Sequence, residues 1–334
     1  MATLGQPLYQ TFVDLARRLD PDGKIALIAE IMEQYNEILD DMLWKEGNLP
    51  TGEKTTIRTG LPVATWRKLN YGVQPSKSTT AQVTDACGML EAYSEIDKAL
   101  ADLNGNSAEF RLSEDRSQLE GMNQTLANTL FYGDTTVNPE RFVGLTPRYN
   151  GLTGSSRTKA NVLDGGGRGN TNTSVWLVHW GPETAYGIYP KGSMGGFQHR
   201  DLGEQTLWDN QTPPGKYQGY RTHYKWDCGL TVRDWRFQVR IANVDVALLT
   251  KDASAGANLI DLMVQAFEIL PAKQMGTPVF YCNKTIRSFL RRQMANKTNA
   301  RLNFDEVMGK HVLSFDGTAV RRVDQISSTE ATVS

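Results

Sequence analysis

The sequence predicts an α+β fold in which helices and one long hairpin come first and a half built mainly of strands follows. Three observations predict it. Apolar residues recur at helical spacing near the N-terminus, a long stretch rich in Gly, Pro and Thr comes next, and beyond residue 144 the runs become short, aromatic and strand-like. A chain of 334 residues has room for one large or two ordinary domains.

The charge balance excludes a protein that holds DNA or an anionic membrane through a global field, because 36 basic residues stand against 37 acidic ones. Any contact with nucleic acid is therefore expected to be local or weak. No apolar run reaches the roughly 18 residues that cross a bilayer, and the first residues lack the features of a signal peptide. We expect no membrane partner and synthesis in a cytoplasm.

Residues 1–45 are predicted to form a helical arm, since apolar residues beyond the turn at Asp20 recur every three or four positions. Residues 46–83 are predicted to form an extended hairpin. With few large apolar residues the hairpin cannot have a core of its own, so it needs a neighbour to lie on.

Alternating residues predict the two strands of this hairpin. One strand is expected around Thr56 and Arg58 and the other around Arg67 and Leu69, joined near residues 60–62. The turn residues Gly60 to Pro62 favour that junction.

The clearest helix is predicted over residues 106–131, with Asn106 and Glu109 resembling a capping box. Its apolar stripe consists of Leu112, Leu119, Met122, Leu126 and Leu130. Further helices are expected over 257–270 and 283–296, with strands at 278–281 and 311–323.

No catalytic constellation, cofactor motif or metal clip is found. The glycine cluster at 165–169 lacks the GK[ST] ending of a P-loop and is interpreted as a mobile loop tip. Cys87, Cys228 and Cys282 are far apart, and the four His residues are scattered. We expect a protein that is not an enzyme, with no cofactor and no metal.

Two further patterns have a structural and a functional interpretation. Ten Trp and Tyr residues lie within 176–235 and could stack on sugars or bases, but the favoured interpretation is that they fill a sheet core or a subunit contact.

The helix predicted after Asn283 has one basic and one apolar face. The basic face consists of Lys284, Arg287, Arg291 and Arg292, and the apolar face of Ile286, Phe289, Leu290 and Met294. DNA could bind this basic face, although a solvated or salt-bridged face is favoured.

The order of helical arm, long hairpin and long spine-like helix resembles the Hong Kong 97-type capsid fold of tailed phages. Within it, the runs EGN, RTGLPVATWRKLNYGV, EIDKALADL, FRLSEDRSQLEGM and LFYGD resemble major capsid proteins of short-tailed phages. These runs lie between residues 30 and 150.

The second half resembles the family in an unusual order. The segments at 279–285 and 307–312 lie at the C-terminus here, whereas in most members they follow the spine helix. The runs VWLVHWGPETAYGIYPKG and DWRFQVRIANVD precede them. This resembles the rearranged connectivity of the Bordetella short-tailed phage subgroup.

The resemblance implies a domain plan. Residues 1–45 form an N-terminal arm in this plan, and residues 46–83 form the E-loop. Residues 84–150 form a P-domain that contains the spine helix 106–131, and residues 205–250 add strands to it. Residues 151–204 form part of the A-domain with loops, and residues 251–334 add its helices and a closing strand.

It also implies a function. A major capsid protein self-assembles into hexamers and pentamers of an icosahedral head that encloses double-stranded DNA, and is expected in the virion after assembly in the bacterial cytoplasm. Expected partners are further copies, scaffolding, portal and cement or decoration proteins, and DNA held weakly and without specificity. We expect subunit contacts at Arg58, Trp66, Arg67 and Lys68.

Two alternatives compete with this interpretation. A β-rich carbohydrate- or receptor-binding phage structural protein would explain the aromatic residues, but it leaves the long helix without a purpose. A nucleic-acid enzyme would need paired acids or a P-loop, and neither is present in the sequence.

Overall fold

The computed structural model describes residues 34, 36–102, 107–153, 156–209, 214–250, 256–271, 275–296, 302–307 and 310–334. The chain divides into two compact units. Unit 1 contains Met1–Gln34, Met89–Leu126 and Gly196–Asp227. Unit 2 contains Tyr35–Gly88, Ala127–Gly195 and Cys228–Ser334.

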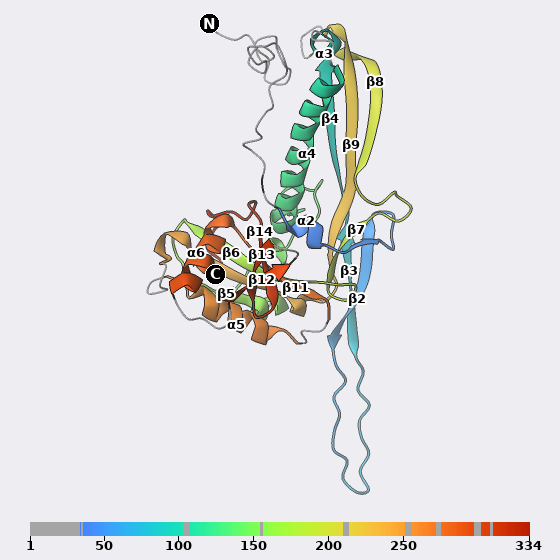
Figure 1. The fold of residues 1–334 in the computed structure, drawn as a ribbon. Coiled ribbons are helices and arrows are strands. Elements are labelled where there is room, and N and C mark those ends of the chain that lie inside the picture. The colour runs from blue at the N-terminus through green and yellow to red at the C-terminus, as the bar shows by residue number, and fades with distance from the viewer. Residues whose placement is uncertain are drawn as a thin grey trace. The chain divides into compact units, whose positions relative to one another are not determined.

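Unit 2 is built on a mixed sheet in which β6 (Asn172–Trp180) is central (Figure 1). Antiparallel neighbours flank β6 on both sides, β10 (Gln238–Asp245) and β11 (Thr277–Cys282). Beyond β10 lies the parallel strand β5 (Val162–Asp164). Beyond β11 follow β14 (Thr318–Arg322), β13 (Lys310–Phe315) and β12 (Leu302–Val307).

One face of this sheet packs against the helices α5 (Leu259–Ile269) and α6 (Lys284–Asn296). Alternate strand residues such as Leu177, Ile241 and Phe280 point to this face and share one apolar core with Met263 and Leu290. Asparagine side chains cap both helices: Asn258 accepts from the backbone N–H of Asp261, and Asn283 from that of Ile286.

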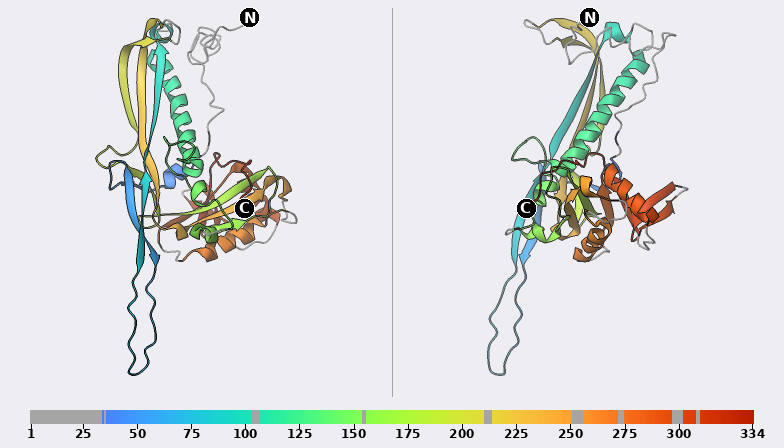
Figure 2. Two further views of the ribbon diagram at one scale, coloured as in Figure 1. Left: turned by 180° about the vertical axis from the view of Figure 1, so that it is seen from behind. Right: turned by 90° about the vertical axis from the view of Figure 1, so that its left-hand side faces the viewer.

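The other face of the sheet in unit 2 has an aromatic core. Trp176 packs against Phe131 and Tyr149, with ring centroids 6.1 and 6.0 Å apart. Arg240, from the neighbouring strand, lies over the Trp176 ring at 5.2 Å. The rear view of Figure 2 shows the strands and α5 of this unit from the opposite side.

Unit 1 packs one helix on a ribbon of strands. The helix is the part of α4 (Ser107–Tyr132) up to Leu126, and it lies along β4 (Gly88–Asp97), β8 (Gln198–Trp208) and β9 (Lys216–Val232) (Figure 1). Phe110 is buried with Ile96 and Leu100 at one end of this layer. Arg111 fixes the same turn of α4 through ion pairing with Asp201 at 2.7 Å.

The remaining elements are short or belong to the hairpin. They are α2 (Ile38–Asp41), β1 (Trp44–Glu46), β2 (Gly52–Gly60), β3 (Thr79–Ala86), α3 (Lys98–Ala101) and β7 (Ala185–Tyr189). Most of the predicted N-terminal helical arm lies outside the described residues, as does Asn106 of the predicted capping box.

The helices predicted over 106–131, 257–270 and 283–296 are confirmed as α4, α5 and α6 with shifts of one or two residues, and the predicted C-terminal strands are confirmed as β11, β13 and β14. In the described part of the predicted helical arm, however, only Ile38–Asp41 is helical, and Trp44–Glu46 is a strand. The predicted stripe of α4 is partly wrong: Leu112 is 55% exposed and Leu119 38% exposed, whereas Met122, Leu126 and Leu130 are buried. Phe110 makes the contact with the strands instead. Because residues two apart on a helix point about 200° apart, Leu112 then faces away.

The glycine cluster is also not the mobile tip that was predicted. Gly165 and Gly167 donate backbone hydrogen bonds of 2.7 Å to the carbonyl oxygens of Ala242 and Asn243. A Cβ atom at Gly167 would lie 2.6 Å from the Asn243 carbonyl, so the loop passes close to β10 and needs glycine there. The cluster fastens a loop to the edge of the sheet.

Candidate self-assembly surface

The β2–β3 hairpin of unit 2 pairs in antiparallel register from Gly52 opposite Ala86 to Gly60 opposite Thr79. Each strand contains three Thr residues, a residue type that favours strands, and the part of the ladder nearest the tip, Thr56–Gly60 and Thr79–Thr84, has no buried residue. The register shifts between Arg58 and Gly60, where a bulge ends the regular ladder.

Beyond the ladder, residues 61–78 continue as two arms to a turn, and we call this segment the hairpin tip (Figure 1). The turn is closed by the backbone N–H of Tyr71 donating to the carbonyl of Lys68 at 3.2 Å. Asn70 adopts a φ of 67° in it, a conformation that Asn tolerates better than most residues. The Ser76 hydroxyl ties the arms by donating to the Val63 carbonyl at 2.9 Å.

The positions predicted for the second strand and the turn are therefore wrong. Arg67 and Leu69 lie at the turn itself, and the second strand begins at Thr79. The turn forms at Asn70, not at Gly60-Leu61-Pro62, because Asn70 adopts the left-handed conformation that the reversal needs. Asn70 was the signal in the sequence that could have placed it.

The hairpin tip exposes an unusual amount of apolar surface. Trp66 is fully exposed at 103% of its reference area, and Leu69 is 85% exposed. Further exposed apolar residues on the tip are Leu61, Val63, Tyr71 and Val73. Large apolar side chains gathered on a segment without a core are typical of a surface that binds another molecule.

The four predicted contact residues lie at two places on the hairpin. Trp66, Arg67 and Lys68 are consecutive at the tip, while Arg58 lies on β2 before the bulge. All four are exposed. An exposed Trp followed directly by Arg is a composition typical of an interface hot spot.

The base of the hairpin, in contrast, is buried. Glu53 and Asp85 lie directly opposite each other in the ladder, and they are 6% and 5% exposed. The Tyr186 hydroxyl donates to Glu53 at 2.7 Å, and the Arg148 guanidinium pairs with Asp85 at 2.9 Å. Burial and the Glu53 carboxylate raise the pKa of Tyr186, so the phenol remains a donor at neutral pH.

Sequence reasoning missed this acidic pair, because its partners are about 60 to 130 residues away along the chain. Gly52 adds to the anchor: a Cβ atom there would lie 2.0 Å from the Asp85 carbonyl. The hairpin is thus fixed at its base and unsupported at its tip.

Other candidate sites have structural roles. The favoured interpretation of the aromatic cluster predicted burial, and the structure buries Trp176, Trp180, Tyr186 and Tyr224, although Trp208 is 54% exposed.

Nowhere among the described residues do three or more His, Cys, Asp or Glu side chains gather as a metal site would need. Among the described helices, none combines the length and apolar content needed to cross a membrane.

Comparison with known proteins decides the family. A family model described as major capsid protein GP7 matches residues 20–334. The chain belongs to this family. It is the major capsid protein of a tailed phage and has the Hong Kong 97-type fold that the sequence predicted.

Among solved structures, this capsid protein is similar to the one in the near-atomic structure of bacteriophage Epsilon15. The two are 38% identical over 100% of this chain and 99% of that chain, with a TM-score of 0.79. The bacteriophage JBD30 capsid matches at 7% identity over 89% of this chain and 93% of that one, with a TM-score of 0.47, a likeness too low to carry a conclusion. Among curated proteins there is no match.

These findings do not favour the carbohydrate- or receptor-binding alternative, because a match over nearly the whole capsid protein accounts for the helices as well as the strands. The rearranged connectivity and the resemblance to the Bordetella subgroup stay predictions.

Proposed function

We propose that this capsid protein builds the pentamers and hexamers of an icosahedral head by laying its hairpin tip on a neighbouring copy. The observation that carries the proposal is the exposure of Trp66 and its apolar neighbours on a segment that has no core. Burial by another chain would stabilise a tip that the described residues of unit 2 leave exposed.

The buried base supports the same role. Arg148 and Tyr186 hold Asp85 and Glu53 at fixed positions, so the two strands leave unit 2 in a defined direction. A defined exit lowers the entropy cost of docking the tip, because less chain must be ordered at the contact. Many such contacts of modest strength in a closed shell add up through multivalency.

The domain plan follows from this proposal. Residues 46–83 act as the E-loop, 84–150 and 205–250 as the P-domain, and 151–204 and 251–334 as the A-domain, with 1–45 as the N-terminal arm. The protein acts as a structural subunit and not as an enzyme.

The wider setting is part of the proposal as well. Assembly takes place in the bacterial cytoplasm with a scaffolding protein and a portal, and the product is the virion shell around double-stranded DNA. A cement or decoration protein reinforces the shell. With a formal net charge of −1, the shell holds its DNA weakly and without sequence preference.

A variant that lacks only the hairpin tip tests the proposal. Residues 61–78 are replaced by Asn-Gly, a two-residue turn that suits the Gly60–Thr79 pair and leaves the buried base intact. We expect a folded protein with an unchanged circular dichroism spectrum that forms no shells, rings or tubes in negative-stain electron microscopy.

A point variant sharpens the test. We expect Trp66→Ala to raise the protein concentration needed for assembly by about tenfold or more, as truncation of an interface hot spot does. Val137→Ala is the matched control, because Val137 is also a large exposed apolar residue of unit 2, at 73%, but lies outside the hairpin. Equal assembly by the parent and the tip variant would contradict the proposal.

A further inference from the structure

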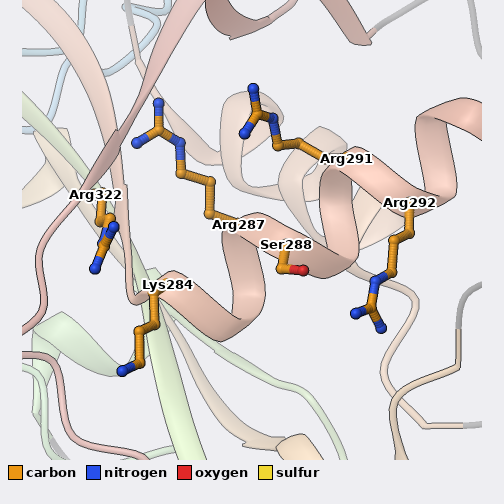
Figure 3. Close-up of a pocket in the computed structure, with 6 residues that line it drawn as sticks. All are labelled: Lys284, Arg287, Ser288, Arg291, Arg292 and Arg322. Carbon is orange, nitrogen blue, oxygen red and sulfur yellow. The ribbon is translucent and has the colours of Figure 1, made fainter.

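A basic pocket lies on the exposed face of α6 in unit 2. Its volume is about 420 Å³, and its lining, which we call the α6 basic face, consists of Lys284, Arg287, Ser288, Arg291, Arg292 and Arg322 (Figure 3). We propose that this face contacts the phosphate backbone of the nucleic acid that the shell encloses. The inference rests on the proposed function and names the place of the DNA contact.

The fold fixes the orientation of this face. Ile286 and Leu290 are completely buried in the core of unit 2, so the cations on the opposite side of α6 must point outward. Asn283 caps the start of the helix. Arg322 is brought beside that start because β14 runs parallel to β11, with Arg322 in register with Cys282.

Two lining arginines form ion pairs with acidic neighbours. Arg322 pairs with Asp324 at 2.7 Å, and Arg287 has a longer contact with Glu37, at 3.7 Å. Glu37 also contacts Arg321, at 3.9 Å, so its charge is shared. Five cations therefore line the pocket, and the ion pairs of Arg287 and Arg322 bring two carboxylates beside it.

The arrangement of the cations suits an extended polyanion better than a single small anion. In Figure 3 the side chains of Lys284 and Arg292 point to one side of α6 and that of Arg291 to the other, so the three do not converge on one point. From residue 284 to residue 292 the helix axis advances by about 12 Å. One strand of DNA carries a charge about every 3.4 Å, so three or four phosphates fit beside the face.

The arginine side chains of the face, and the spacing of charges along the bound polymer, favour a phosphodiester backbone over an acidic peptide. Four of the five lining cations are Arg, whose planar fork binds phosphate oxygens in pairs, and Ser288 adds a hydroxyl donor among them. An extended acidic peptide turns alternate side chains away, so it offers about half as many charges per length to one face. A phosphodiester chain carries its charge at every step, whatever its sequence.

The test measures DNA binding by full-length, unassembled protein. The probe is a fluorescently labelled duplex of about 20 base pairs, with anisotropy recorded over a series of salt concentrations. The variant Lys284→Gln/Arg291→Gln/Arg292→Gln should bind at least about tenfold more weakly at low salt. Its slope of log affinity against log salt should be shallower by about 2 to 3, close to one for each phosphate that the protein no longer neutralises.

The matched control is Arg157→Gln/Lys191→Gln/Arg200→Gln, which removes three exposed cations elsewhere and changes the net charge equally. It should keep both the affinity and the slope of the parent. The charge-preserving variant Arg291→Lys/Arg292→Lys should keep the salt slope, and circular dichroism verifies that each variant folds. Inorganic phosphate and poly-glutamate serve as competitors.

Several outcomes would overturn the inference. These are an unchanged slope in the triple glutamine variant, an equal weakening in the control, or displacement of DNA by inorganic phosphate or poly-glutamate at matched charge concentration. Negative-stain electron microscopy of the same proteins under assembly conditions separates the two proposals. Parent protein that forms no shells contradicts the proposed function, while shells together with unaltered DNA binding in the variant contradict only the α6 basic face.

Discussion

The guanidinium of Arg240 lies 3.0 Å from the carboxylate of Glu330, and the two side chains are only 2% and 5% exposed. This pair joins β10 to the C-terminal segment across 90 residues of chain. Arg240 also donates to the Tyr149 carbonyl at 2.9 Å and to the Ser174 hydroxyl at 3.0 Å, while Glu330 accepts from the hydroxyls of Tyr132 and Ser174. The pair therefore fixes the end of the chain to the sheet of unit 2.

Removing the Glu330 carboxylate should destabilise the folded protein. We expect Glu330→Ala to lower the free energy of unfolding by about 3–5 kcal/mol, because a buried guanidinium loses its counter-charge. Urea unfolding at neutral pH measures the change. The control is Glu183→Ala, which breaks an exposed pair with Arg233 and should cost less than about 1 kcal/mol. Similar losses in both variants would refute the role of Glu330.

The stability of the protein should depend on the charges of Glu53 and Asp85 at the base of the hairpin. Glu53 and Asp85 are opposed in register, and neither Glu53 Oε2 nor Asp85 Oδ2 has a hydrogen-bond partner in the part of the chain that the structure describes. We expect Glu53→Gln to raise the free energy of unfolding by about 0.5–1 kcal/mol through relief of repulsion. Arg148→Met should lower it by about 3 kcal/mol, since Asp85 then lacks its cation. Urea unfolding checks both signs, and destabilisation by Glu53→Gln would contradict the assignment.

The buried imidazole of His179 should make stability depend on pH. Burial is the main cause, and it lowers the pKa of His179 from 6.5 to about 4. The neutral form is thus favoured in the folded protein, so this contribution is fully present above pH 6.5 and is lost as the pH falls from there toward 4.

A variant isolates this contribution from that of the carboxylates. Between pH 7 and pH 4 the parent should lose about 3 kcal/mol more of its unfolding free energy than His179→Asn loses. Urea unfolding at several pH values gives both curves. Parallel curves would show that His179 does not carry the pH dependence.

The three cysteines should differ in the rate at which their thiols react. Burial raises the pKa of the Cys282 thiol to about 12, and Cys228 is also buried, whereas Cys87 is partly exposed at the base of the hairpin. We expect Cys87 to react first with a thiol reagent at neutral pH, and the other two only after unfolding. Mass spectrometry of the native, unassembled protein identifies the labelled residue, and rapid labelling of Cys282 would be the contrary result.

The sequence predicts those features that depend on local pattern. The helices α5 and α6 were found because apolar residues recur at helical spacing and Asn or Pro marks their ends. The two faces of α6 followed from the same periodicity, and the structure confirms that Ile286 and Leu290 are buried opposite the cations.

Features that depend on distant partners could not be predicted. Arg240 and Glu330, or Asp85 and Arg148, have nothing in their own neighbourhood that marks them as buried, because their partners lie 90 and 63 residues away. The hairpin turn was missed for a different reason: Gly60 and Pro62 compete as turn residues with Asn70, and the extended arms between them have no core to reveal their register.

The central claim is that the hairpin tip is buried by a neighbouring copy. Electron cryo-microscopy of shells assembled from the full-length protein tests it most directly. The account predicts closed shells with five-fold and six-fold capsomers in which Trp66 lies against the surface of an adjacent subunit. Shells in which residues 61–78 project free into solvent would contradict it.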